Sequence, residues 1–175
     1  LATLVEAAPG GDDWLHEIKF DGYRAIARIE NGEVRMLSRN GLDWTDRYAP
    51  IAAELATLGA DTAILDGEVI VQLDSGASSF GALQEDLGNG RTDRLRYVVF
   101  DLLYLDGRDL TGAPLRQRKT LLASLLADRP APALVAYVDD VRGQGPAFLA
   151  QACAYGLEGI VSKRVESPYR PGSRG

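Results

Sequence analysis

The chain of 175 residues contains one cysteine, one histidine and only three lysines. Cys153 has no second cysteine for a disulfide, and the apolar residues around it predict that it is a small core residue. A chain without disulfides is typical of a reducing, intracellular compartment. His16, as the only histidine, cannot form a histidine-based triad or a histidine-rich zinc site, and we interpret it as an ordinary strand residue.

Other absences narrow the class of protein further. No apolar run is long enough to span a bilayer and no signal peptide opens the chain, so we expect no membrane partner. The start at Leu1, without an initiator methionine, suggests a soluble fragment of something longer. A net charge of −6 excludes wrapping of nucleic acid by bulk electrostatics and predicts weak DNA affinity. Nucleic acid could still contact residues 163–174 or Arg91, Arg94 and Arg96 locally. For these three arginines, a solvated surface is the favoured interpretation.

The hydrophobic pattern predicts one α+β domain with mixed, largely antiparallel sheets flanked by helices. Turn signals such as Asn31-Gly32 and Asp106-Gly107 separate the expected strands. The pattern predicts strands over residues 14–20, 23–30, 34–38, 63–71, 95–105, 134–138 and 159–164, helices over 46–58, 115–127 and 146–155, and loops over 74–79 and 128–132. Frequent hairpins argue against a doubly wound parallel sheet.

Lysine is scarce, and Lys19 lies inside the densely charged run of residues 17–24. The chain fills sixteen of its nineteen cationic positions with arginine, which keeps its proton under all ordinary conditions. A lysine amine can attack an electrophile when its site lowers its pKa. Lys19 is therefore a candidate nucleophile.

Polar groups gather at the ends of four predicted strands, in residues 19–24, 38–41, 66–68 and 158–163, and we expect them to line one cleft. Arginines suit phosphates and ribose hydroxyls, carboxylates suit a hard cation such as Mg²⁺, and glycines let the backbone approach a nucleotide. The sequence has neither a Walker loop nor a dinucleotide fingerprint, so side chains would hold the phosphates. The set predicts phosphoryl or nucleotidyl transfer.

The run Lys19-x-Asp21-Gly22-x-Arg24 resembles the first motif of the covalent nucleotidyltransferases, which comprise ATP-dependent DNA ligases, RNA ligases and messenger-RNA capping enzymes. Further runs resemble that superfamily's later motifs in order: Ser38-Arg39-Asn40-Gly41, Asp66-Gly67-Glu68, residues 99–104 and residues 158–164. Residues 1–3, 100–107 and 169–174 are most similar to the adenylation domain of multidomain bacterial ligases that repair double-strand breaks by end joining. The resemblance implies an ATP-grasp-like nucleotidyltransferase fold over residues 1–175.

The resemblance also implies a role for each motif residue. Lys19 would attack the α-phosphate of ATP and carry AMP, which then passes to a DNA 5′-phosphate before a 3′-hydroxyl seals the nick. The backbone of Glu17 and Ile18 would read the adenine edge, and Phe100 would stack on adenine. Arg24 and Glu68 would contact the ribose region, Arg39 would contact the ribose or the incoming 5′-phosphate, and Lys163 would bind the nucleotide. Glu68 and Glu158 would bind Mg²⁺ or Mn²⁺.

Structural interpretations stand beside these functional ones. Core packing explains Phe100 equally well, a satisfied turn carboxylate is the alternative for Glu68 and Glu158, and a surface salt bridge is the alternative for Lys163. Asp21 is expected to orient the Lys19 turn.

The similar ligases continue with a Trp-x-Lys-x-Lys motif and an OB-fold domain, and neither occurs before Gly175. We therefore expect a truncated adenylation domain that is inactive alone. Its implied partners are nicked or broken duplex DNA, a Ku-like end-binding protein, and flanking OB-fold and other repair domains, in the bacterial cytoplasm at the nucleoid. An RNA ligase, a capping guanylyltransferase and a non-catalytic nucleotide-binding module remain open alternatives.

Overall fold

The computed structural model describes residues 3–73, 75–127, 129 and 133–171. Two sheets and their helices are built from elements in the order β1 (Gly11–Ile18), β2 (Tyr23–Glu30), β3 (Glu33–Ser38), the 3₁₀ helix η1 (Thr45–Tyr48), α1 (Ala49–Leu55), β4 (Thr62–Val71), α2 (Phe80–Gly88), β5 (Leu95–Leu105), β6 (Arg108–Asp109), α3 (Leu115–Leu125), β7 (Val135–Tyr137), β8 (Asp140–Gly143), α4 (Gly145–Ala154) and β9 (Ile160–Arg164).

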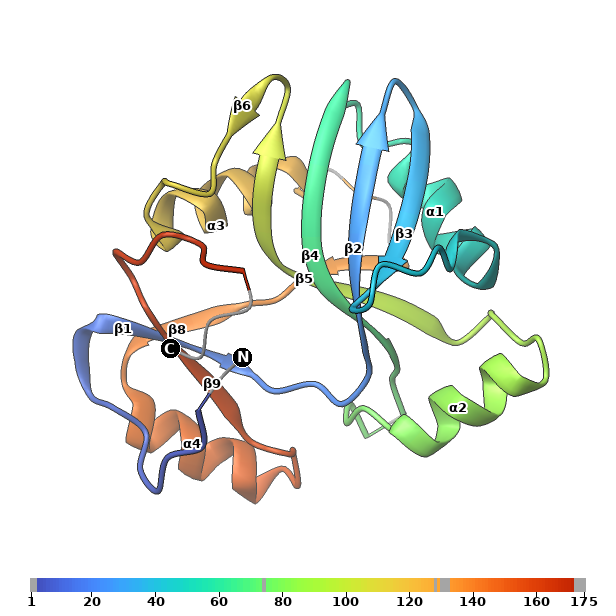
Figure 1. Cartoon of the computed structure of the whole chain (residues 1–175). Coiled ribbons are helices and arrows are strands. Elements are labelled where there is room, and N and C mark those ends of the chain that lie inside the picture. The colour runs from blue at the N-terminus through green and yellow to red at the C-terminus, as the bar shows by residue number, and fades with distance from the viewer. Residues whose placement is uncertain (1–2, 74, 128, 130–132, 172–175) are drawn as a thin grey trace.

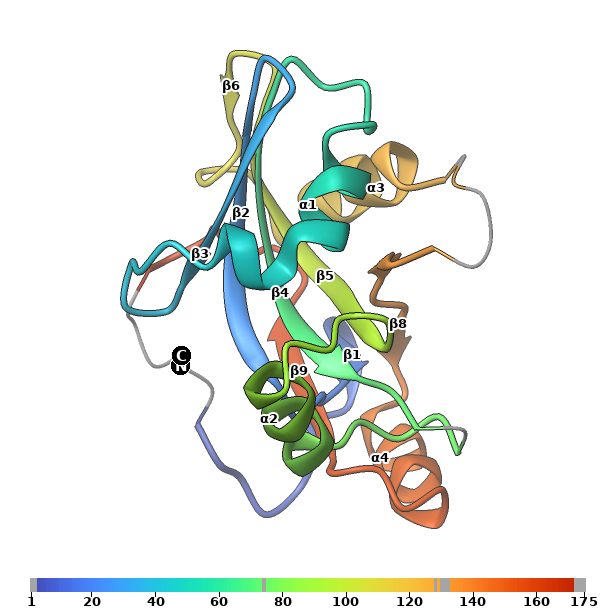
Figure 2. The same ribbon diagram turned by 90° about the vertical axis from the view of Figure 1, so that its right-hand side faces the viewer.

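The larger sheet has six strands and forms the main body of the molecule (Figure 1). Its order is β3-β2-β4-β5-β6 with antiparallel neighbours, and β7 joins β5 in parallel. Helices α1 and α3 cover the same face of this sheet (Figure 2). The central strand β5 is a nearly continuous apolar run, whereas β4 is apolar on either side of Asp66-Gly67-Glu68.

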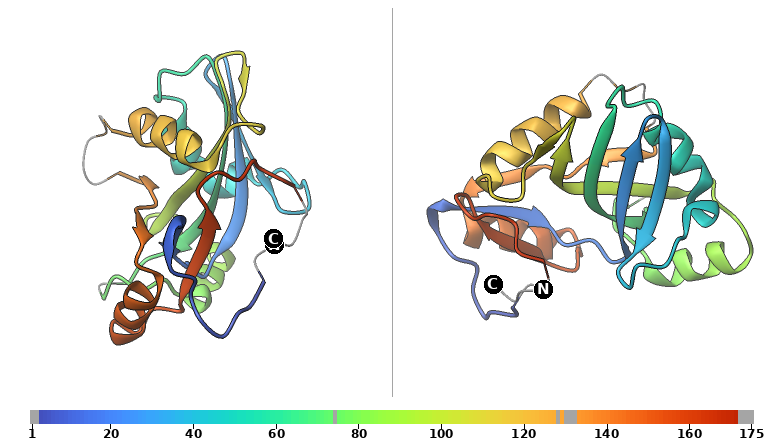
Figure 3. Two further views of the ribbon diagram at one scale, coloured as in Figure 1. Left: turned by 90° about the vertical axis from the view of Figure 1, so that its left-hand side faces the viewer. Right: turned by 45° about the horizontal axis from the view of Figure 1, so that its top comes forward.

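The smaller sheet has three antiparallel strands in the order β8-β1-β9. It places β1, from the start of the chain, between two strands from its last third, and α4 lies against it (Figure 3). The chain crosses from this sheet to the larger one through residues 19–22, between β1 and β2. The two sheets therefore meet at the predicted nucleophile.

The predicted α+β class and the largely antiparallel sheets are confirmed. The strands over 23–30 and 95–105 have the predicted limits. The helix over 46–58 is wrong at both ends, because residues 45–48 form a 3₁₀ turn and α1 ends at Leu55. Pro50 lies in the first turn of α1, where the missing amide hydrogen has no intrahelical partner to lose. Helix α2 and strands β6 and β8 were not predicted.

The prediction that Cys153 is a core residue is wrong, because Cys153 is exposed on α4. Its neighbour Ala152 is the buried residue of that turn, and one helical step of about 100° separates the two directions. Among the described residues, no helix has the length and apolar character needed to cross a membrane. Residues 1–2 and 172–174 of the motif resemblance, and most of the loop expected over 128–132, lie outside the described residues.

Candidate active site

Lys19 lies directly after β1, where the chain leaves the smaller sheet. Its backbone N–H donates a hydrogen bond of 3.0 Å to the Gly159 carbonyl, and its amine forms an ion pair with the Glu158 carboxylate. The side chains are 47% and 43% exposed, so the expectation from the sequence that the Lys19 amine is half-buried is wrong. This contact brings the first and last of the predicted motifs together.

A cavity of about 200 Å³ opens beside the Lys19 amine. Three segments line it, residues 18–21, 76–78 and 156–158. The Asp21 backbone N–H donates to Ser78 Oγ at 2.9 Å, which fixes the turn after Lys19 against the loop that follows β4. Asp21 therefore orients this turn through its backbone, and the cavity leaves room for a ligand next to the amine.

Gly22 lets the Lys19 turn approach β4 closely. A Cβ atom at this position would clash with the Val69 carbonyl oxygen and would lie 3.0 Å from Glu68 Cγ, so a larger residue would force the two segments apart. Glu68 is consequently held near the Lys19 turn in a half-buried position. Burial raises the pKa of Glu68, and the Lys19 and Arg24 cations reduce that rise.

Arg24 is fixed by a two-point contact with a buried acid. Its Nε donates to Asp66 Oδ1 at 2.9 Å and its Nη2 donates to Asp66 Oδ2 at 2.5 Å. The Asp66 side chain is 0% exposed, and this hydrogen-bonded pairing raises the pKa of Arg24 well above its usual value. Arg24 is also paired in register with Glu68 across β2 and β4, so both predicted ribose-region residues share one place on the sheet.

Glu17 is buried at the centre of a charged network. Its carboxylate accepts hydrogen bonds from Lys119 at 2.6 Å and pairs with Lys163 at 2.5 Å. Lys119 also donates to the Val138 carbonyl at 2.6 Å, and its ammonium lies 4.2 Å from the centre of the Tyr137 ring. The buried Glu17 carboxylate would lose a partner if β1 or either lysine moved away. The network therefore fixes β1, the strand that ends at Ile18 directly before Lys19.

Phe100 lies half-buried on β5, which agrees with its core-packing interpretation, and adenine stacking stays a prediction. One part of the ring packs against the cluster of Ile70, Val98 and Val138. The Lys163 ammonium lies 4.5 Å from the ring centre and the Arg24 guanidinium 5.9 Å from it. The aromatic face is therefore a cation-binding surface in this structure.

Arg39 is the predicted site residue that the structure leaves apart. It is exposed in the turn after β3, where Gly41 N–H donates to the Ser38 carbonyl. Ser38 pairs in register with Ala25, so the turn lies at the same end of the β2–β3 hairpin as Arg24. Within the described residues, no hydrogen bond or ion pair joins Arg39 to the rest of the set.

The structure adds three residues that sequence reasoning missed: Asp66, Lys119 and Tyr169. Lys119 had a detectable signal, because Leu115, Lys119 and Leu122 follow one helical stripe and both leucines are buried. Asp66 stands in a run that was singled out, but its partner comes from another strand. The Tyr169 hydroxyl contacts both Arg24 and Asp66, and nothing in the local sequence indicates that contact.

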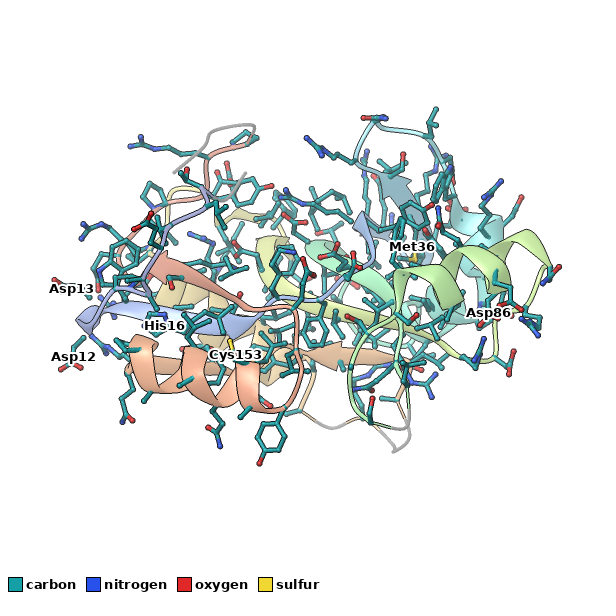
Figure 4. All side chains as sticks on the ribbon, turned by 90° about the horizontal axis from the view of Figure 1, so that it is seen from below. Asp12, Asp13, His16, Met36, Asp86 and Cys153 are labelled. Atoms are coloured by element: carbon teal, nitrogen blue, oxygen red, sulfur yellow. The ribbon has the colours of Figure 1, made fainter. Side chains whose placement is uncertain are left out.

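Arg91 and Arg94 are surface residues, as the favoured interpretation of their sequence predicts. Arg91 and Arg94 form ion pairs with Asp86 at 2.8 Å and 2.7 Å, and Arg91 also pairs with Glu85. Asp86 lies on α2, at the far side of the larger sheet from the smaller one (Figure 4). These cations are thus engaged at a distance from Lys19.

A metal ion would have to share its ligands with a substrate here. Across the described residues, no group of three or more His, Cys, Asp or Glu side chains is arranged to hold a metal. Glu158 and Glu68 both lie near the Lys19 amine, and their oxygens are the hard donors that Mg²⁺ and Mn²⁺ accept. The residues fit a cation whose remaining ligands are water and phosphate oxygens.

Comparison with known proteins places this geometry in a family. Residues 3–175 match the model of the ATP dependent DNA ligase domain. The chain is 43% identical over 173 residues to the multifunctional non-homologous end joining protein LigD of Pseudomonas aeruginosa, a match that covers 97% of this chain and 20% of that protein. The M. tuberculosis LigD is 37% identical over 163 residues, covering 92% of this chain and 20% of that protein.

Solved structures agree with the sequence matches. The ligase domain of M. tuberculosis LigD superposes with a TM-score of 0.87 at 37% identity, covering 100% of this chain and 55% of that one. A mycobacterial DNA ligase D complexed with ATP and MES gives a TM-score of 0.85 at 36% identity, covering 100% and 56%. Fold and site therefore define a nucleotidyltransferase domain of the kind found in DNA ligases.

The chain belongs to the ATP-dependent DNA ligase domain family. The resemblance drawn from its motifs is confirmed, and the RNA ligase, capping and non-catalytic alternatives are not favoured. The chain spans about a fifth of the length of the curated relatives it matches.

Proposed function

We propose that this chain is the adenylation unit of a longer ATP-dependent DNA ligase that seals broken duplex ends in end-joining repair. The observation that carries the proposal is the cavity lined by Lys19 and Glu158, whose side chains form an ion pair. The Lys19 and Arg24 cations also act on the half-buried Glu68 carboxyl, although neither Glu68 nor Arg24 lines the cavity. Its relatives named for non-homologous end joining support the repair role. A Ku-like end-binding partner, an OB-fold domain with the missing lysine motif, and a place at the bacterial nucleoid belong to this proposal.

Lys19 carries the chemistry in this mechanism. Its nitrogen attacks the α-phosphorus of ATP, a nitrogen–phosphorus bond forms, and the bond to the pyrophosphate oxygen breaks. A protonated amine cannot attack, so Lys19 must first give up a proton, and its ion pair with Glu158, which favours the ammonium form, must separate for this to happen. An oxygen of a DNA 5′-phosphate then attacks the AMP phosphorus as the nitrogen–phosphorus bond breaks and releases Lys19. A 3′-hydroxyl finally attacks the 5′-phosphate phosphorus, and AMP leaves.

The other predicted residues hold the nucleotide around that reaction. Arg24 and Glu68 contact the ribose region, Phe100 stacks on adenine, and the backbone of Glu17 and Ile18 reads the adenine edge. Adenine must take the ring face that the Lys163 ammonium now occupies, which makes Lys163 available to the nucleotide as it moves. Arg39, exposed at the same end of the sheet as Arg24, would meet the ribose or the incoming 5′-phosphate.

Glu68 and Glu158 would hold a divalent cation together with water and phosphate oxygens. When bound, such an ion supplies positive charge that offsets the negative charge of the triphosphate. Both carboxylates lie near the attacking amine, which is the position this role requires.

The test is covalent labelling with α-radiolabelled ATP in the full-length protein that contains this chain. The wild type is expected to take up one acid-labile, alkali-stable label, which maps to the peptide that contains Lys19. Lys19→Ala is expected to remain unlabelled, while the control Arg28→Ala, which removes an exposed cation elsewhere, labels normally. Equal labelling of Lys19→Ala would remove Lys19 from the mechanism.

A further inference from the structure

The segment that follows β9 reaches back to the nucleotide site. Its backbone is fixed to the start of α3, since Leu115 N–H donates to the Ser167 carbonyl at 3.0 Å and Arg116 N–H donates to the Val165 carbonyl at 3.1 Å. Tyr169 N–H donates to the Thr111 carbonyl at 2.8 Å. These bonds fix the backbone of the segment, and the Tyr169 hydroxyl contacts Arg24 and Asp66 of the larger sheet.

The Tyr169 hydroxyl completes the polar group around Arg24. It accepts a hydrogen bond from Arg24 Nη2 at 3.2 Å and lies 3.1 Å from Asp66 Oδ2, to which it can donate its proton. Burial, and next the Asp66 charge, raise the pKa of Tyr169 to about 12, so the phenol keeps its proton at neutral pH. The hydroxyl therefore links the cation and the acid simultaneously.

Arg24 needs this second support because Asp66 alone does not enclose it. The Arg24 side chain is 36% exposed, whereas Asp66 is fully buried. Nε and Nη2 are used by Asp66 and Tyr169, and among the described residues none accepts a hydrogen bond from Nη1. One guanidinium nitrogen thus stays available to a ligand while the others determine its direction.

From this arrangement we infer that Tyr169 is a positioning residue for nucleotide binding, which acts by holding the Arg24 guanidinium in its ligand-binding direction. The inference rests on the proposed function, in which Arg24 contacts the ribose region. It also means that the segment after β9 and the nucleotide site influence each other, because any movement of residues 165–169 displaces the hydroxyl from Arg24.

The test compares Tyr169→Phe with the wild type in ATP-dependent labelling of the full-length protein. Loss of one hydrogen bond to a held group is expected to raise the half-saturating ATP concentration about five-fold. The maximal rate should stay within about two-fold, because the contact is equally present before and during reaction. The matched control is Ser167→Ala, which removes the Ser167 Oγ bond to the Arg164 carbonyl in the same segment and should leave both parameters unchanged.

A second variant separates positioning from general structural damage. In an Arg24→Lys background the two-point contact with Asp66 is lost, so Tyr169→Phe should add no further loss of ATP affinity. Independent, multiplicative effects of the two substitutions would overturn the inference. Unchanged ATP dependence in Tyr169→Phe would overturn it as well.

A spectroscopic measurement distinguishes failure of the inference from failure of the proposed function. In the ¹⁵N-arginine-labelled chain, hydrogen exchange at Arg24 Nε should be slow in the wild type and about five-fold faster in Tyr169→Phe. The Arg94 Nε signal, bound to Asp86 at 2.8 Å on α2, should stay unchanged. If the wild type takes up no label, the proposed function fails. The Arg24 exchange rates then test the inference alone, and equal rates in the wild type and Tyr169→Phe would refute it.

Discussion

The two sheets of this molecule are stabilised by different kinds of buried contact. The larger sheet buries an extended apolar cluster that includes Leu65, Val69 and Val99. The smaller sheet contributes Leu15 to a cluster with only Leu115 and Val165. The larger sheet therefore gains its stability chiefly from removal of apolar surface from water.

The smaller sheet buries fewer apolar residues and is stabilised in part by buried polar groups. Glu17 is buried on β1, and Lys119 reaches its carboxylate from α3 at 4% exposure. Such groups are stable only when each is paired, so they specify one arrangement more strictly than apolar side chains do. The contrast suggests why Lys19 follows β1: the strand that ends at the nucleophile is held by directional contacts.

Lys119→Ala is expected to cause the largest loss, about 3–5 kcal/mol in the free energy of unfolding. The substitution leaves the buried Glu17 carboxylate with one of its two lysines and opens a cavity between α3 and the smaller sheet. Denaturant unfolding followed by circular dichroism measures the loss. The double variant Glu17→Gln/Lys119→Met, which removes both charges at similar volume, should be milder; if it is equally damaged, pairing is not what matters.

Leu65→Ala should cost slightly less, about 3 kcal/mol, through lost apolar burial and an unfilled cavity in the larger sheet. The same unfolding experiment applies. Leu65→Met, which conserves volume, should cost below about 1.5 kcal/mol. A large penalty for Leu65→Met would show that this core depends on specific shape as strictly as the smaller sheet depends on pairing.

The same contrast explains what could be predicted from the sequence. Strands of the larger sheet, such as the one over residues 95–105, were correctly bounded because burial on both faces produces a long apolar run. Strand β8 was missed because Asp140–Gly143 is short and polar at a sheet edge. Its pairing with β1 depends on residues from the other end of the chain, which no local pattern contains.

The candidate site also contains residues with a local sequence signal and residues whose contacts come from distant segments. Lys19, Arg24, Glu68 and Glu158 were singled out as candidates because each lies in a compact run of charge beside glycine. Asp66 and Tyr169 act through partners in distant segments, so their roles required coordinates.

The pH dependence of stability should report on His16 in the smaller sheet. His16 lies between β1 and α4 (Figure 4), with Nδ1 2.8 Å from Ser162 Oγ and, among the described residues, no partner for Nε2. Burial lowers the pKa of His16 in the folded state. The unfolded chain therefore binds a proton near pH 6.5 that the folded chain does not, so stability falls as the pH decreases below about 6.5, by up to about 1.4 kcal/mol per pH unit.

His16→Asn is the comparison that isolates this effect, because His16 is the only histidine. The raised pKa of Glu68 acts with the opposite sign, since it favours the folded state at low pH, but it is present in both proteins and cancels in their difference. Unfolding curves from pH 7 to pH 5 should therefore be less pH-dependent in His16→Asn. Parallel curves for the two proteins would show that His16 is protonated in the folded state as readily as in the unfolded chain.

The smallest effect is expected from Arg28→Ala on the larger sheet, within about 0.5 kcal/mol. Arg28 pairs with Glu30 at 2.9 Å, but the two side chains are 56% and 57% exposed, so water solvates both charges whether or not they meet. The substitution is chemically parallel to Lys119→Ala, because each replaces a paired cation by alanine, and the two differ mainly in burial. Unfolding of both variants at 50 mM and 500 mM salt sharpens the comparison, since only the exposed pair is screened. If Arg28→Ala destabilised the chain as much as Lys119→Ala, charge pairing itself would stabilise both sheets, and the distinction between them would not hold.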